Sequence, residues 1–252
     1  MSRRIALLCL VSWALPCAAQ ELSAQALVDR VAEALGGRER LAAVSGYEMT
    51  STAEGMGLSG TATIWTRFPD CQRNELSLPP LALLSVHAGG EAWLRDHNGQ
   101  VVAYTEHQLA DAITGLYIDA FRPWIEPFDP DVIERAEPFD VDGELSPALL
   151  VTAPGGLPWV LVLDPGTFLP RMQLHPDESG IGMEVLLLRD YREVDGIQVP
   201  HEVVGYNDAL PDNGTVYRVE SLRFGNPEGA ALFQQPVEAS DVTFPPGVTS
   251  VP

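Results

Sequence analysis

The chain has 252 residues with 35 acidic and 15 basic side chains, all of the latter arginine, so that its formal net charge is −20. This charge opposes binding to nucleic acids and to anionic lipid surfaces, because both depend on basic patches. Without any lysine, the chain can form no Schiff base, no Ser-x-x-Lys pair and no phosphate-binding Walker motif.

The first nineteen residues have the order that is typical of a secretory signal. Arg3 and Arg4 precede an apolar stretch over residues 5–15, and Ala18 and Ala19 supply the small residues before a cleavage site. The apolar stretch is too short to span a bilayer. We therefore expect residues 1–19 to be removed and residues 20–252 to form a single domain, which resides in the periplasm or is secreted and has no transmembrane segment.

The mature chain is expected to begin with an amphipathic helix over residues 23–35. Its apolar residues recur with helical spacing, Ser23 is a suitable N-cap, and Gly36 and Gly37 are a typical stop. Two strands are predicted next, over residues 47–54 and 58–68, because apolar and polar residues alternate in the first and Thr, Ile and Trp are frequent in the second.

A hairpin and a second helix are predicted in the middle of the chain. Residues 91–95 and 100–104 flank an Asn98-Gly99 pair, which is a strong hairpin signal because both residues tolerate positive φ. Thr105 and Gln108 then form a capping-box pattern at the start of a helix over residues 105–117. Four prolines among acidic residues predict a long loop or lid over residues 122–138.

The C-terminal half is predicted to be a meander of antiparallel strands. Strand-like runs cover residues 148–153, 157–164, 169–175, 181–194, 197–206 and 215–224. Turn residues separate them at 154–156, 164–166, 179–180, 195–196 and 213–214. Because two amphipathic helices accompany this sheet, the expected fold is mainly β with α (α+β): a curved antiparallel sheet forms a half-barrel, and the helices cover its concave side.

Several short segments resemble the outer-membrane lipoprotein-sorting proteins, the LolA/LolB-like superfamily of periplasmic lipoprotein carriers. They are Ala34-Leu35-Gly36-Gly37, Gly90-Glu91-Ala92-Trp93, Leu163-Asp164-Pro165 with Leu169-Pro170, the stretch from Asp190 to Pro200, and Asn226-Pro227 with Phe233 and Pro236. The resemblance covers most of the mature chain and is weakest over residues 105–147. It implies a half-barrel with an apolar cavity for acyl chains.

No pattern for a cofactor, a transition metal or a catalytic nucleophile is present. The five histidines are scattered, with no His-x-x-x-His or Cys-x-x-Cys, and no Gly-x-Ser-x-Gly elbow occurs. Acidic clusters at 129–134 and 140–144 lack the ordered ligands of a calcium loop and are better explained as solvated turns. We therefore expect no cofactor, no metal and no enzymatic activity, with a hydrolase as a remote alternative.

Apolar residues on the predicted strands are the candidates for a ligand-binding surface. They are Ile64, Trp93, Trp159, Leu161, Met183, Val185, Leu187, Ile197, Val199 and Val203. Such stripes can form an ordinary closed core or the wall of a cavity. The favoured interpretation is a monomeric envelope protein that binds a lipid, an acyl chain or an acylated protein. The alternative is a module that docks or senses an envelope protein partner.

Overall fold

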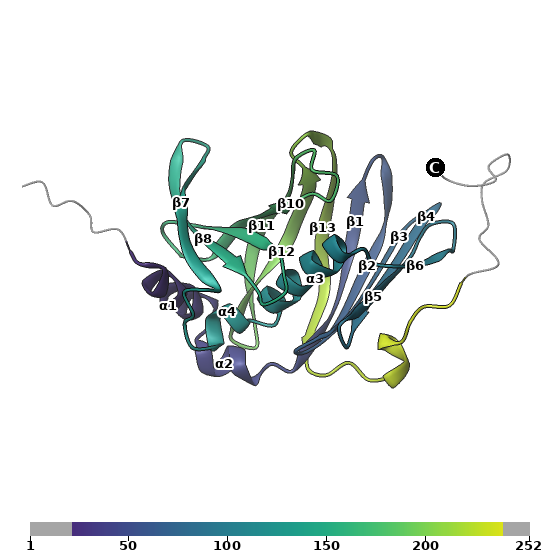
Figure 1. The fold of residues 1–252 in the computed structure, drawn as a ribbon, viewed down its shortest axis with the longest axis horizontal. Coiled ribbons are helices and arrows are strands. Elements are labelled where there is room, and N and C mark those ends of the chain that lie inside the picture. The colour runs from purple at the N-terminus through teal and green to yellow at the C-terminus, as the bar shows by residue number, and fades with distance from the viewer. Residues whose placement is uncertain (1–21, 239–252) are drawn as a thin grey trace, which may run out of the picture.

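The computed structural model describes residues 22–238, which form one antiparallel sheet of thirteen strands with helices on one of its faces (Figure 1). The strands before the central helix are β1 (Gly46–Gly55), β2 (Leu58–Arg67), β3 (Cys71–Leu78), β4 (Leu81–Ala88), β5 (Glu91–Arg95) and β6 (Val101–Ala103). Those after it are β7 (Ile133–Val141), β8 (Glu144–Thr152), β9 (Pro158–Leu163), β10 (Pro170–Pro176), β11 (Met183–Val194), β12 (Ile197–Asn207) and β13 (Leu210–Phe224).

The sheet is built as two meanders that meet in its centre. From β1 the chain runs outward through neighbouring strands to the edge strand β6, crosses to the opposite edge strand β7, and returns strand by strand to β13, which pairs with β1. The sheet curves but β6 and β7 do not pair, so that it stays an open half-barrel. This confirms the predicted fold class.

The helices lie on the concave face of this sheet, which we call the helix face. They are α1 (Ala24–Leu35), α2 (Arg38–Ala43), α3 (Glu106–Asp119) and α4 (Arg122–Ile125). A short 3₁₀ helix, η1 (Ala230–Phe233), follows the last strand and packs on the opposite face of the sheet, where Leu232 O accepts a hydrogen bond from Arg73 of β3. The crossover helix α3 runs across the hollow of the sheet, whereas α1, α2 and α4 gather at one end of it (Figure 1).

Both predicted helices have the predicted caps. Ser23 Oγ accepts the N–H of Ala26 at the start of α1, and Thr105 and Gln108 form the complete capping box of α3. After α1, Gly36 has a φ of +128°, and a Cβ atom there would lie 2.3 Å from the carbonyl oxygen of Gly196 in the β11–β12 turn. Only glycine therefore allows the end of α1 to approach the sheet this closely.

The prediction of a loop over residues 122–138 is wrong for two segments, 122–125 and 133–138. Pro123 lies in the first turn of α4, where a proline needs no N–H partner, and residues 133–141 form the edge strand β7. Pro138 is tolerated in β7 because the pairing with β8 is irregular between Ala136 and Phe139. Proline content thus indicated a loop where the structure has a helix and an edge strand.

The turn predicted at Asn213 and Gly214 is also wrong, since both residues lie inside β13. The β12–β13 hairpin turns earlier, at Asp208 and Ala209, where Asn207 pairs with Leu210. Asn207 Oδ1 accepts the N–H of Ala209 and closes this turn. In addition, the strands β3 and β4 belong to a part of the chain for which no element was predicted.

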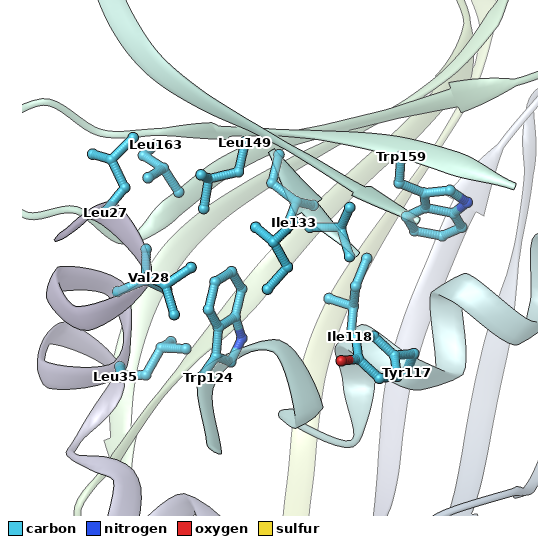
Figure 2. Close-up of a cluster of buried hydrophobic side chains, with 14 of the residues drawn as sticks. Leu27, Val28, Leu35, Tyr117, Ile118, Trp124, Ile133, Leu149, Trp159 and Leu163 are labelled. Carbon is cyan, nitrogen blue, oxygen red and sulfur yellow. The ribbon is translucent and has the colours of Figure 1, made fainter. Parts of the chain in front are cut away.

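The main core lies between the helices and the helix face at the β7–β9 end of the sheet (Figure 2). Trp124 of α4 occupies its centre at 2% exposure, between α1 and the strands that carry Ile133 and Leu149. The apolar stripe of α1 contributes Leu27, Val28, Val31, Ala32 and Leu35. The core therefore anchors α1, α2, α4 and the end of α3 to one end of the half-barrel, and leaves the middle of the helix face beneath α3 less completely filled.

A second, smaller apolar cluster lies on the opposite face of the sheet, which we call the outer face. Its buried members are Ala148, Val162, Met172, Leu174 and Val185. They come from neighbouring strands, and the register places Val162 next to Met172, and Leu174 next to Val185. Strands β8, β9 and β11 thus carry apolar residues on both faces, whereas β10 carries Gln173 and His175 on its helix face.

Candidate functional site

An apolar cavity of about 280 Å³ lies between the helix face and the helices α3 and α4. Its wall comes from both meanders and from the helices. The apolar and aromatic residues of this wall are Leu35, Tyr47, Met49, Ile64, Ile118, Phe121, Trp124, Pro170, Leu186, Leu188, Tyr191, Val199, Pro200, Val203, Leu222 and Phe224. Among all lining residues only Asp119, Gln173 and Gln198 are acidic or amide side chains. A largely apolar, concave wall with few polar groups is typical of sites for small apolar ligands.

A polar cavity of about 380 Å³ lies beside it, between α3 and the strands β3 to β5. Its polar lining residues are Gln72, Asn74, Ser85, His87, Tyr104, Gln108, Asp111, Asp119 and Gln173. Asp119, Gln173 and Leu186 line both cavities, so that the two spaces adjoin. Together they form an amphipathic space beneath α3, with an apolar and a polar part.

Asp119, at the end of α3, lies where the two parts meet. Its Oδ2 accepts a hydrogen bond from Gln72 Nε2 at 3.1 Å and one from the Tyr47 hydroxyl at 3.4 Å. Burial raises the pKa of Asp119 from 3.8 to about 6, although both hydrogen bonds favour the ionised form. The same loss of solvent raises the pKa of Tyr47, so that its phenol stays a protonated donor.

The hydrogen-bonded chain continues from Gln72 to the next residue on the helix face of β3. Asn74 Nδ2 donates to Gln72 Oε1 at 3.2 Å, which leaves Asn74 Oδ1 buried without a partner. Nδ1 of His87 is likewise buried and unpartnered, and burial lowers the pKa of this histidine although Asp70 opposes the shift. The polar wall therefore has unused hydrogen-bonding capacity, and burial disfavours the protonated form of its histidine.

Asp111 and His175 form a second polar group at the wall of the same space. Asp111 Oδ1 accepts a hydrogen bond from Trp159 Nε1 at 2.8 Å and lies 2.9 Å from His175 Nδ1. The indole of Trp159 stacks on the imidazole of His175 with 4.2 Å between ring centroids and 9° between planes. Asp111 therefore lies between an indole donor and a histidine that becomes a cation when it is protonated.

Four of the ten residues proposed for ligand binding line these cavities. Ile64, Val199 and Val203 lie on the wall of the apolar cavity, and Trp159 lies on the wall of the polar one. Leu161 and Ile197 also face the helices, but they are closed into the main core with at most 2% exposure.

The other four lie on the outer face. Val185 is buried in the outer-face cluster, and Met183 and Leu187 pack against it. Trp93 pairs with Val86 across β4 and β5, and its neighbour Leu94 lines the polar cavity, so that alternation turns Trp93 to the outer face. On β11 the cavity is instead lined by Leu186 and Leu188.

On β11 the sequence pattern does not distinguish the residues that face the cavity from those that lie on the outer face. Residues 185–188 are four consecutive aliphatic residues, so that either alternate set can be read as the buried one. The polar residues beneath α3 were not singled out either. Gln72, Asn74, Ser85 and His87 do alternate along β3 and β4, and this period of two is the signal that could have placed them on one face.

Neither a metal centre nor a helical membrane span is found in the part of the chain that the structure describes. Residues 22–238 hold no group of three or more His, Cys, Asp or Glu side chains that could bind an ion. Their helices are all too short or too polar to cross a bilayer. The signal sequence expected over residues 1–19 lies outside the described residues.

Solved structures of other proteins share this fold. A LolA superfamily protein from Nitrosomonas europaea matches with 11% identity and a TM-score of 0.53, over 85% of this chain and 98% of its own. A DUF1329 family protein from Desulfovibrio piger matches with 13% identity and a TM-score of 0.50, over 84% and 97%. No protein-family model and no curated protein matches the sequence. The resemblance found in the sequence is therefore confirmed at the level of the fold.

Proposed function

We propose that this protein binds an apolar ligand, such as a lipid, an acyl chain or an acylated protein, beneath α3 and acts as a carrier without catalysis. The observation that supports this most is the apolar cavity, which is open between the helices and the sheet although the adjoining core is tightly closed. A core without a binding role gains stability by filling such space. The LolA-superfamily fold of the neighbour from Nitrosomonas europaea agrees with a carrier.

Binding of an uncharged fluorescent apolar probe, N-phenyl-1-naphthylamine, tests this proposal. We expect saturable binding to the parent protein. Leu188→Glu should weaken it at least about tenfold, because the substitution places a carboxylate in the apolar cavity, where it must give up its hydration.

Leu187→Glu is the matched control, since it introduces the same charge at the next residue of β11 but on the outer face. It should leave probe affinity within about twofold of the parent value. Circular dichroism must show a preserved sheet in both variants. Equal weakening by the two substitutions, or no binding to the parent protein, would contradict the proposal.

We also propose that the protein works in the periplasm or outside the cell. The support is the order of basic, apolar and small residues over positions 1–19. Intact mass spectrometry of the protein from the cell envelope should give the mass of residues 20–252. A species that retains Met1 would show that this assignment is wrong.

A further inference from the structure

We propose that the ligand is amphipathic and that its head group, held in the polar cavity, donates hydrogen bonds and carries no negative charge. This inference rests on the proposed function, because it assumes that an apolar chain occupies the neighbouring cavity. The two cavities share Asp119, Gln173 and Leu186, so one molecule can occupy both without crossing a layer of protein.

The charges in the wall decide against an anionic head. Asp111 and Asp119 both line the polar cavity, and no arginine is among its lining residues. His87 is a poor source of compensating positive charge, because burial lowers its pKa and so disfavours the protonated ring. A carboxylate or phosphate that entered would lose its hydration next to two like charges, with no arginine in the wall to pair with. His175, beside this wall, already faces Asp111 at 2.9 Å. The net charge of the chain adds to this repulsion.

The hydrogen-bonding groups of the wall favour a donor. Both carboxylates can only accept hydrogen bonds when they are ionised. Asp119 has lone pairs beyond those used by Gln72 and Tyr47, and Asp111 has lone pairs beyond those that face Trp159 and His175. The donation of Asn74 Nδ2 to Gln72 orients the Asn74 amide and leaves its oxygen as an unused acceptor at the same wall. Amide N–H, hydroxyl and ammonium groups share the required chemistry, which an ester or a carboxylate lacks.

Four ligands with the same long acyl or alkyl chain test the head group near pH 8, where a carboxylic acid is ionised. They are the primary amide, the primary amine, the methyl ester and the carboxylate, each measured by displacement of the fluorescent probe. We expect the amide or the amine to bind at least about tenfold more tightly than the carboxylate. The ester, which only accepts hydrogen bonds, should fall about threefold to tenfold below the amide. The order of amide and amine distinguishes a neutral from a cationic head.

A double variant links this preference to the wall. Asp111→Asn with Asp119→Asn keeps an acceptor oxygen at each position and removes both charges. The ratio between the affinities for the amide and the carboxylate ligands should therefore fall at least about threefold. The control variant, Asp131→Asn with Asp142→Asn, removes two exposed charges that do not line the cavity. It should leave the ratio between the two affinities unchanged.

The outcomes separate the two proposals. If the carboxylate binds as tightly as the amide and the amine, the head-group inference is wrong, whereas the proposed function stands. An unchanged ratio between the affinities for the amide and the carboxylate, in the variant with Asp111→Asn and Asp119→Asn, also overturns the inference. If neither the probe nor any of the four ligands binds, the proposed function fails and the inference fails with it.

Discussion

Trp124→Ala is expected to lower the free energy of unfolding by about 3–5 kcal/mol. Trp124 is 2% exposed and touches the packed side chains of α1 and of the strands β7 and β8 at the centre of the main core. Truncation removes one of the two buried tryptophans of this core and leaves a void that its neighbours cannot fill completely. Because Trp124 also lines the apolar cavity, the substitution should loosen the attachment of α4 beside the proposed ligand.

Urea unfolding followed by circular dichroism measures this loss. Trp93→Ala is a matched control, because the same truncation is made at a partly buried position on the outer face and away from both cavities. It should cost clearly less than Trp124→Ala. A loss below about 1 kcal/mol for Trp124→Ala would mean that α4 does not hold the helices to the sheet as the structure implies.

Asp119→Asn is expected to stabilise the protein at neutral pH by as much as about 3 kcal/mol. The pKa of Asp119 is raised to about 6 in the folded state from 3.8, so the folded chain holds this proton more tightly than the unfolded chain does. Unfolding therefore releases a proton between about pH 4 and about pH 6, and stability falls as the pH rises through this range. Each pKa unit corresponds to about 1.4 kcal/mol.

The asparagine variant cannot ionise, and its amide oxygen can still accept the hydrogen bond from Gln72. We expect its advantage over the parent protein to be absent below about pH 4, to grow between about pH 4 and about pH 6, and to stay constant above. Urea unfolding across this range measures the difference. Asp131→Asn, at an exposed position, reports the general effect of removing one negative charge. If the stability difference between Asp119→Asn and the parent protein does not change with pH, the pKa of Asp119 is not raised by burial, and this prediction is wrong.

Local signals in the sequence were sufficient for the elements that depend on local contacts. The cap at Ser23 and the capping box at Thr105 and Gln108 fix helix starts through bonds within four residues, and both occur as predicted. The hairpin at Asn98 and Gly99 and the C-terminal meander rest on turn chemistry and alternation, which are also local. Together with the two helices, these elements predict a half-barrel, although they do not give its strand order.

Only the tertiary structure decided which residues face the cavity. On β11, aliphatic residues on both faces make the register ambiguous, and the strand is fixed by its neighbours: Leu186 meets Gln173 beneath α3, whereas Leu187 meets Met172 on the outer face. Likewise, Asp119 and Gln72 are 47 positions apart and come together only because α3 crosses the sheet to reach its other edge. Alternation shows that a strand has two faces, but which of them is covered depends on where distant segments pack.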